Sequence, residues 1–331
     1  MSGTAGAGMR AAERPRLAVG ILTFRRPEQL RASLAAVRAR TRDALGHVDA
    51  RIVVVDNDPD ASARSVVVAM RDDPDATHPI PIDYAHEPRP GIAAARNRAL
   101  DEAGDAHLLA FIDDDEIPQP GWLTSLVEVW RSTGADAVMG RVVAQLPPGT
   151  EPWVASSAFF QRATHTTGTL LEVAATGNLL LDLTTIRRMG LRFDESLGLA
   201  GGEDTVFTSM LTQRGGTIVW CQESVTIDPV VPERATREWV LQRAFAHGNR
   251  LQQTRLRLAA TPGERAVLRL RGIAGGLARI GLAAGQLVWG ASMGDARRRH
   301  RSEIQLRRGW GVLVGGLGHQ HEEYRRAEAA R

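Results

Sequence analysis

Four short runs typical of strands, three of them almost wholly apolar and each followed by a helical or polar segment, dominate the first 140 residues of this chain. The runs cover residues 17–22, 51–55, 82–86 and 107–112, and the second contains the β-branched stretch Ile52-Val53-Val54-Val55. A strand buried on both faces has such a continuous apolar sequence, whereas a half-exposed strand alternates. Strands and helices that alternate at this spacing predict an α/β fold with a doubly wound, largely parallel sheet.

Polar side chains with binding chemistry follow these runs at the points where the strands should end. Thr23 and Arg25 follow the first run, and Asp56 and Asp58 follow the second. Arg96 and Asn97 lie on the helix expected over 92–102, after the third run. Ligands of open α/β sheets bind outside the carboxyl ends of the strands. We therefore expect these side chains to converge at one edge, where they could bind a nucleotide diphosphate.

The fourth run ends in the acidic segment Asp113-Asp114-Asp115-Glu116. Clustered carboxylates repel one another unless a cation or hydrogen-bond donors compensate them. Mg²⁺ or Mn²⁺ would suit such oxygen ligands, usually with substrate phosphates completing the coordination. The alternative is a polar loop that caps a helix beginning near Pro118.

A second acidic pair follows a glycine-rich loop in the segment Gly201-Gly202-Glu203-Asp204. The apolar spacing after it predicts a helix that begins at this pair. One interpretation of the pair is a simple helix N-terminus whose acids interact with the helix dipole. Alternatively, one carboxylate acts as a general base while its neighbour binds a sugar hydroxyl.

Several classes of protein and compartment are excluded or disfavoured by what the sequence lacks. No G-x-G-x-x-G follows the first strand, which disfavours a dinucleotide-binding protein. Because the chain contains no lysine, a P-loop nucleotide-binding protein is excluded. Cys221 is the single cysteine, so an intramolecular disulfide is impossible. Residues 1–14 have no apolar core, and we expect a disordered tail there instead of a secretory signal.

Together these motifs resemble family 2 of the inverting glycosyltransferases, which have the nucleotide-sugar-binding GT-A fold. The resemblance covers about residues 17–248 and depends on five segments in the family's order: 21–27, 54–57, 87–97, 111–116 and 201–204. Within the family, the chain looks most like bacterial exopolysaccharide glucosyltransferases of the succinoglycan-assembly kind. The resemblance implies a metal-dependent hexosyltransferase that uses a UDP-sugar and has a D-x-D motif.

The resemblance also implies roles for individual residues. Asp204 matches the family's catalytic base, and Glu203 matches its acceptor or sugar contact. Asp113 and Asp115 match the metal-binding D-x-D aspartates, with Asp115 in direct contact. The remaining donor-site candidates share the nucleotide-sugar pocket: Thr23, Arg25, Asp56 as nucleoside contact, Asp58, Arg96, Asn97, Asp114, and Asn178 in the segment flooring the sugar pocket. That last segment could equally be a turn.

Asp228 stands where the family often has a histidine. An aspartate there could be a third metal ligand, since its oxygen suits a hard cation. It could equally be a solvated residue at the end of a strand.

The C-terminal part of the chain differs in charge from the rest. From Val230 to Arg331 there are 19 arginines against 8 acidic residues. The spacing of apolar residues predicts an amphipathic helix over about 265–290, with Leu270, Ile273, Leu277 and Ile280 on its apolar side. We expect this helix to lie in the plane of an anionic membrane surface, followed by an arginine cluster at residues 297–301. The alternatives are a helix packed on the catalytic domain and a nucleic-acid-binding tail, but interleaved aromatics that favour nucleic acid are missing.

These observations predict four regions and one function. The regions are the tail 1–14, a nucleotide-sugar-binding half at 15–140, an acceptor and catalytic-base half at 141–248, and a basic helical region at 249–331. The function is transfer of a sugar from a nucleotide sugar to a saccharide acceptor, lipid-linked, at the cytoplasmic face of the cell membrane, with no nucleic-acid partner. The alternatives are a nucleotidyltransferase and a degenerate nucleotide-sugar-binding scaffold without turnover.

Overall fold

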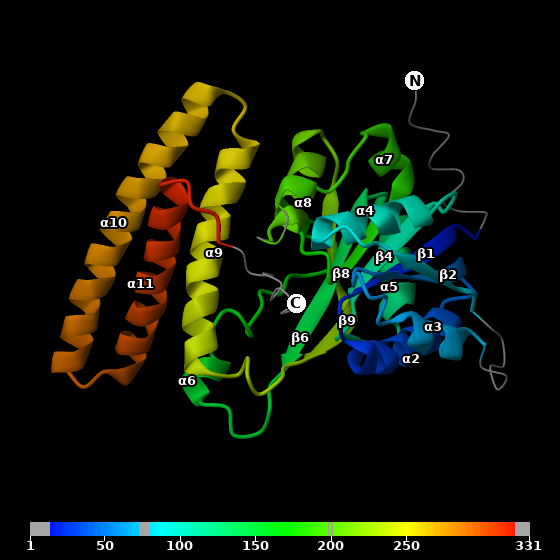
Figure 1. Cartoon of the computed structure of the whole chain (residues 1–331), viewed down its shortest axis with the longest axis horizontal. Helices are drawn as coiled ribbons and strands as arrows, with labels where there is room; N and C mark the ends of the chain where they lie inside the picture. The colour runs from blue at the N-terminus through cyan, green and yellow to red at the C-terminus, as the bar shows by residue number, and fades with distance from the viewer. Residues whose placement is uncertain (1–13, 73–79, 198, 200, 322–331) are drawn as a thin grey trace. The chain divides into compact units, whose positions relative to one another are not determined.

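The computed structural model describes residues 14–72, 80–197, 199 and 201–321, which form two compact units (Figure 1). Unit 1 comprises residues 1–144, 163–198 and 203–229, and unit 2 comprises residues 145–162, 199–202 and 230–331. Of the predicted tail, only Arg14 is among the described residues. The helical unit therefore includes residues from Val230 onward, whereas the sequence placed the start of the helical region at residue 249.

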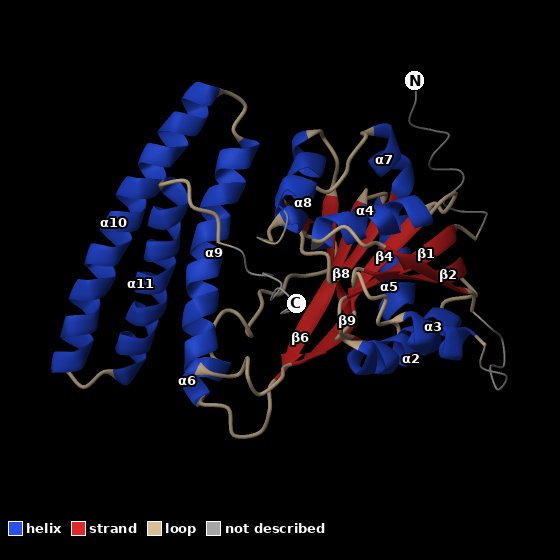
Figure 2. Cartoon of the chain, in the orientation of Figure 1, coloured by secondary structure: helices blue, strands red, loops and turns tan. Residues whose placement is uncertain are grey.

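Unit 1 is built on one mixed nine-stranded sheet (Figure 2). Its order is β3-β2-β1-β4-β8-β6-β9-β5, and β7 pairs with β9 outside this path. The strands are β1 (Arg16–Thr23), β2 (Asp49–Asp56), β3 (Ile82–His86), β4 (Leu108–Asp113), β5 (Ile117–Pro118), β6 (Ala137–Gln145), β7 (Leu170–Leu171), β8 (Asn178–Asp182) and β9 (Ile218–Pro229). The first four sequence-predicted strands are the parallel half, and β8 begins the antiparallel half by pairing with β4.

Helices cover both faces of this sheet, as the doubly wound pattern predicts (Figure 1). One face packs against α2 (Pro27–Asp43), α3 (Arg64–Arg71) and α5 (Trp122–Thr133). The other packs against α4 (Ile92–Glu102), α7 (Leu183–Arg188) and α8 (Glu203–Gln213). Because the central strands are buried on both faces, side chains such as Val53 and Val54 enter opposite cores.

The helix expected near Pro118 begins later, and that expectation is wrong. Ile117 and Pro118 form β5, which pairs with Ile227 and Thr226 of β9, and the helix α5 begins at Trp122. Proline is tolerated on a short edge strand because it need not donate to the ladder there. The partner strand lies more than 100 residues away in the sequence, so local spacing could not indicate this pairing.

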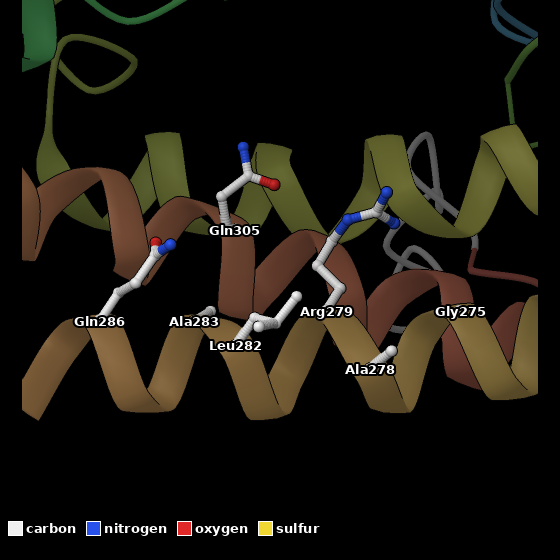
Figure 3. A pocket seen from close by; sticks show the side chains of 7 residues that line it. All are labelled: Gly275, Ala278, Arg279, Leu282, Ala283, Gln286 and Gln305. Carbon is white, nitrogen blue, oxygen red and sulfur yellow. The ribbon is translucent and has the colours of Figure 1, made fainter.

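Unit 2 contains three long helices, α9 (Arg237–Leu258), α10 (Pro262–Ser292) and α11 (Ala296–Gly316), and the short α6 (Pro152–Ala155). α11 packs against both α9 and α10, and glycines let the backbones approach closely. A Cβ on Gly276 of α10 would lie 2.8 Å from the backbone nitrogen of Leu313, and one on Gly311 of α11 would meet the Phe245 carbonyl. A shallow groove of about 340 Å³ runs along α10, with Gln305 of α11 on its rim (Figure 3). None of the described helices is both long and apolar enough to span a bilayer.

Candidate active site

The carboxyl ends of β1, β2 and β4 bring the predicted polar residues together at one sheet edge. Thr23 pairs in register with Asp56, and Leu22 pairs with Asp113. The backbone N–H of Asn57 donates to the carbonyl of Thr23 at 2.9 Å, so the loops begin side by side. The sequence-predicted convergence of these strand ends is therefore present in the structure.

Asp114, the second residue of the acidic segment, is buried at the carboxyl end of β4. Its two oxygens accept hydrogen bonds from the Thr23 hydroxyl at 2.7 Å and from Arg26 at 3.2 Å. Burial raises the pKa of Asp114 to about 6, although the nearby Arg26 charge opposes this shift. Asp114 therefore connects the first strand to the acidic turn, and its neighbours Asp113 and Asp115 are left to face other partners.

Arg26 is a site residue that sequence reasoning missed. The same Nη1 atom that reaches Asp114 also donates to Asp115 at 2.8 Å. Asp115 has 24% of its side chain exposed, against 7% for Asp114. The position of Arg26 directly after Arg25, past the end of the first strand, was the feature of the sequence that could have indicated its role. A cation bound to Asp115 must compete with or displace this guanidinium.

Asp56 organises the loop after β2. Its carboxylate is fully buried and accepts from the backbone N–H groups of Asp58 at 3.0 Å and Ala63 at 2.8 Å, and from the Tyr84 hydroxyl at 3.0 Å. Burial, assisted by the Asp56 charge, raises the pKa of Tyr84 to about 12, so this hydroxyl remains a donor. Arg25, with φ at 53°, pairs through Nε with Asp58 at 3.1 Å. A connected set of polar contacts at the carboxyl end of β2 therefore includes Asp56, Asp58, Tyr84 and Arg25.

Asp113 and Glu116 approach the backbone at Gly177. A Cβ at position 177 would lie 2.8 Å from Glu116 Oε1 and 3.1 Å from Asp113 Oδ2, so only glycine fits without movement. Glu116 is buried and accepts from the Thr226 hydroxyl at 2.7 Å. Ile117 of β5 pairs with Ile227 of β9 in an antiparallel register. Glu116 and Asp228, the next residues outward on the two segments, are therefore expected to lie beside each other. Asp228 is thus near the acidic turn, although its role as a metal ligand stays a prediction.

The Asn178 side chain joins four elements. Its Oδ1 accepts from Trp122 Nε1 of α5 at 2.9 Å and from the Ser224 hydroxyl of β9 at 3.3 Å. Its Nδ2 donates to the carbonyls of Arg141 in β6 and of Ser224, each at 3.2 Å. With these bonds Asn178, the first residue of β8, fixes the strands beside Asp113. Its contact with a donor sugar remains a prediction.

The Glu203-Asp204 pair begins α8 as expected, and the two carboxylates have different surroundings. Glu203 is buried and forms an ion pair with the equally buried Arg96 of α4. The Arg96 guanidinium also lies 5.6 Å from the centre of the Phe193 ring. Asp204 is only partly buried, and its Oδ1 accepts from the backbone N–H of Thr205 at 2.6 Å. Asp204 is therefore the more accessible carboxylate, while Glu203 is held by α4.

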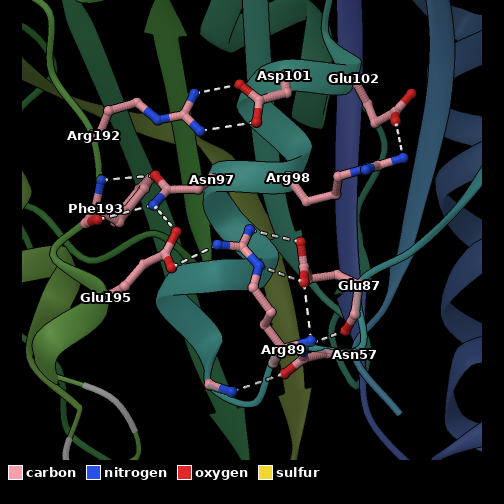
Figure 4. Close-up of polar contacts among 11 residues, drawn as sticks. Asn57, Glu87, Arg89, Asn97, Arg98, Asp101, Glu102, Arg192, Phe193 and Glu195 are labelled. Atoms are coloured by element: carbon pink, nitrogen blue, oxygen red, sulfur yellow. Dashed lines mark hydrogen bonds and ion pairs between the residues drawn. The ribbon is translucent and has the colours of Figure 1, made fainter. Parts of the chain in front are cut away.

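Asn97 and Arg89 connect residues 193–195, which precede the Glu203-Asp204 pair, to α4 and to the loop after β3 (Figure 4). Asn97 Nδ2 donates to the carbonyl of Phe193 at 3.0 Å and to Glu195 at 2.9 Å, and its Oδ1 accepts from the Phe193 N–H at 2.9 Å. Arg89 donates to Glu87 through Nε and Nη2 and to Glu195 through Nη1 at 2.8 Å. The structure thus places Asn97 in support of residues 193–195, which precede the Glu203-Asp204 pair in the chain.

The donor set at this edge fits a divalent cation held mainly by its substrate. Within the described residues no group of three or more histidine, cysteine or acidic side chains is arranged to hold a metal alone. Mg²⁺ and Mn²⁺ in phosphate-transferring sites are commonly held by one or two carboxylates, with phosphates and waters as the other ligands. Asp113 and Asp115 supply such a pair.

The mixed sheet, with β1 to β4 parallel and acidic residues at the end of β4, has the GT-A fold that two solved structures share. The family model described as Glycosyl transferase family 2 matches residues 18–192, and the chain belongs to that family. Succinoglycan biosynthesis protein ExoM of Rhizobium meliloti (strain 1021) is 36% identical over 303 residues, which cover 91% of this chain and 92% of that relative.

Two solved structures share the fold at low sequence identity. The mannosyltransferase PcManGT from Pyrobaculum calidifontis, in complex with GDP-Man and Mn²⁺, has a TM-score of 0.57 and 17% identity, and the match covers 93% of this chain and 87% of that chain. GalNAc-T7 with UDP, GalNAc and Mn²⁺ has a TM-score of 0.53 and 15% identity, and the match covers 73% of this chain but 51% of that chain. At these identities the similarity shows the fold alone.

Proposed function

We propose that this protein is an inverting glycosyltransferase that moves a sugar from a nucleotide-diphosphate sugar to a hydroxyl group of a saccharide. The observation that carries the proposal is the unequal setting of the two adjacent carboxylates at the start of α8. Glu203 is neutralised by buried Arg96, whereas Asp204 is partly exposed at the helix N-terminus. A nucleotidyltransferase with a similar sheet would have no need of this second carboxylate site.

Each residue then has a defined task in a single displacement. Asp204 takes the proton of the attacking hydroxyl, which is otherwise a poor nucleophile. One base on the face opposite the leaving group gives inversion of configuration, as in one-step inverting glycosidases. Asp113 and Asp115 would hold a divalent cation, which when bound neutralises the negative charge on the departing diphosphate. Arg96 would hold the Glu203 carboxylate in place beside Asp204.

The nucleotide is proposed to be UDP, with Asp56 and Thr23 on its nucleoside side. The two solved relatives hold different nucleotides, UDP in one and GDP-mannose in the other, so the fold itself does not select the base. Both contain Mn²⁺, which supports a divalent cation in this family of folds. The carboxylate of Asp56 is buried, so a base contact from it would need the loop after β2 to rearrange.

The acceptor is proposed to be a lipid-linked saccharide in the synthesis of a cell-surface polysaccharide, at the cytoplasmic face of the membrane. The name of the relative ExoM, succinoglycan biosynthesis protein, supports polysaccharide assembly, because the match covers nearly the whole of both chains. The arginine excess after Val230 supports an anionic surface as the place of reaction.

The substitution Asp204→Asn tests the proposed base. It keeps the size of the side chain but removes the proton acceptor, so turnover should fall by about 10²-fold or more. UDP-sugar binding in the presence of Mn²⁺, measured by calorimetry, should hardly change. Asp105→Asn, at a side chain that is 79% exposed before β4, is the matched control and should keep full activity.

Two results would contradict this assignment. If Glu203→Gln abolishes turnover while Asp204→Asn remains active, the roles of the pair are reversed. If a UDP-, GDP- or dTDP-sugar raises the melting temperature with Mn²⁺ but is neither hydrolysed nor transferred, the protein is a nucleotide-sugar-binding scaffold without turnover.

A further inference from the structure

The outer face of α10 is a strip of exposed apolar side chains. Six large ones are between 56% and 70% exposed: Leu270, Leu277, Leu282, Val288, Trp289 and Met293. Five of them recur over a helix of 31 residues, which is about 45 Å long, and Met293 directly follows its end. Soluble proteins rarely expose large contiguous apolar patches without a binding function.

The orientation of α10 is fixed by its opposite side. Gly272, Gly276, Ala283 and Gly290 are buried against the neighbouring helices, where a larger side chain would clash with the backbone or side chains they meet. Ile273 and Ile280, which the sequence placed on the apolar side with Leu270 and Leu277, are partly buried against α11. For these two residues the expected membrane-facing position is wrong, because the close glycine contacts decide which side of the helix packs inward.

The charge around this face is mainly positive, with Glu264 in the first turn of α10 and Asp295 just beyond its end as the flanking acidic residues. From Arg265 to Gly294 the sequence has four arginines and no acidic residue. Beyond the end of α10 lie the exposed Arg297, Arg298, Arg299 and Arg301 of α11. The Arg298 guanidinium lies 5.0 Å from the centre of the Trp289 ring, which joins the apolar strip to the basic cluster.

The groove beside the strip combines the same two kinds of group. Leu282 and Ala278 line it together with Arg279 and Gln286, and Gln305 of α11 closes the far side (Figure 3). An arginine and two amides next to apolar side chains provide donors for a phosphate beside a surface for an acyl chain.

We propose that the outer face of α10 docks onto the surface of an anionic phospholipid bilayer. The helix lies in the plane of the membrane, with the apolar strip at the boundary between headgroups and acyl chains and with the arginines on the lipid phosphates. Trp289 then takes the interfacial position that tryptophan favours in membrane proteins. The inference rests on the proposed function in one respect, that a lipid-linked acceptor would lie in the same bilayer.

A second copy of the chain fits the same face less well. No carboxylate lies between Arg265 and Gly294, and the eight arginines at 265, 269, 271, 279, 297, 298, 299 and 301 outnumber the flanking Glu264 and Asp295, so two such faces would bring together an excess of positive charge. Lipid phosphates supply that counter-charge.

Cosedimentation with vesicles tests the proposal. The full chain should bind vesicles of phosphatidylcholine containing phosphatidylglycerol and should bind pure phosphatidylcholine weakly. The double substitution Leu277→Glu/Leu282→Glu should weaken binding by at least about 10-fold, because two apolar anchors become charges. Leu170→Glu is the matched control, since Leu170 is 70% exposed in unit 1, and it should leave vesicle binding unchanged.

Fluorescence quenching by brominated lipid identifies the face itself. Trp289→Phe should remove most of the quenching, whereas Trp310→Phe, at a side chain 50% exposed on α11, should preserve it. Helical content of every variant is checked by circular dichroism, and hydrolysis of the nucleotide sugar in solution should be unchanged by the α10 substitutions. If the native protein does not hydrolyse any nucleotide sugar, that result would count against the proposed function and not against the docking face.

Three outcomes would overturn the docking face. One is equal binding of the native chain to both kinds of vesicle, and another is quenching that is lost with Trp310 instead of Trp289. The third is a native dimer that becomes monomeric in Leu277→Glu/Leu282→Glu while vesicle binding persists, which would show that a second copy covers the strip.

Discussion

Arg26 is the residue at which the electrostatics of the acidic edge can be tested most directly. Its guanidinium contacts both Asp114 and Asp115, so it would compete with a metal ion for the Asp115 carboxylate. Burial disfavours the charged guanidinium, but the two carboxylates outweigh this effect and raise the pKa of Arg26. An internal cation of this kind reduces repulsion among the aspartates before substrate arrives and must lower the affinity for free metal.

We predict that Arg26→Gln and Asp115→Asn shift metal binding in opposite directions. Arg26→Gln removes a competing charge, so the Mn²⁺ concentration for half-saturation should fall several-fold, whereas Asp115→Asn should raise it by about 10-fold or more. Electron paramagnetic resonance of free Mn²⁺ in the presence of UDP measures both. Arg31→Gln, an exposed arginine on the same helix, should have no effect.

The assignment of Asp115 as a metal ligand would be refuted by an unchanged Mn²⁺ titration in Asp115→Asn with intact thermal stability. Asp228→Ala extends the same titration to the third proposed ligand. A change of metal affinity in that variant would distinguish a ligand from a structural strand-end residue.

At the scale of elements, the packing of α9 against α11 contains a partly buried histidine whose charge state should affect stability. Burial, together with the positive charges of Arg308, Arg250 and Arg243, lowers the pKa of His247 to about 4. An unfolded histidine titrates near its ordinary value, so the unfolded chain binds an additional proton as the pH falls below about 6.5. The stability contributed by neutral His247 is therefore complete above that pH and is lost as the pH falls toward about 4.

We predict that His247→Gln reduces the acid sensitivity of the helical unit. Urea unfolding followed by circular dichroism between pH 7 and pH 4.5 should show a smaller decrease in the free energy of unfolding than in the native protein. The control is His165→Gln, at an exposed position in unit 1, whose free energy of unfolding should depend on pH as that of the native protein does. Identical pH slopes for all three proteins would exclude a role for His247.

The elements also show which parts of the structure the sequence could predict. The β-branched run before Asp56 and the helix over 92–102 follow local rules, and both were predicted correctly. The β5–β9 pairing could not be predicted, because Pro118 finds its partner Thr226 only through long-range folding. For the same reason the spacing indicated Asp113 and Asp204 but gave no sign that Arg96 would pair with Glu203 or that Asn178 would bridge four elements.

At the scale of the whole molecule, chemistry and charge belong to different parts of the chain. The proposed nucleotide, metal and base residues all precede Val230, whereas the region from Val230 onward holds 19 of the 41 arginines. Binding at a charged surface and turnover of the donor should therefore be separable by mutation. This separation holds whatever the arrangement of the two units.

We predict that replacing Arg297, Arg298, Arg299 and Arg301 by glutamate releases the protein from anionic vesicles. Each arginine near an anionic surface contributes about 1 kcal/mol, and the attraction is screened within roughly 10 Å at 0.1 M salt. The variant at low salt should therefore resemble the native protein at high salt, and hydrolysis of the nucleotide sugar in solution should continue. Four exposed arginines of unit 1 changed to glutamate provide a charge-matched control: Arg31, Arg71, Arg188 and Arg214. If that control releases the protein equally, net charge alone governs binding; if only the 297–301 variant does, the basic cluster beside Trp289 is the electrostatic part of the docking surface.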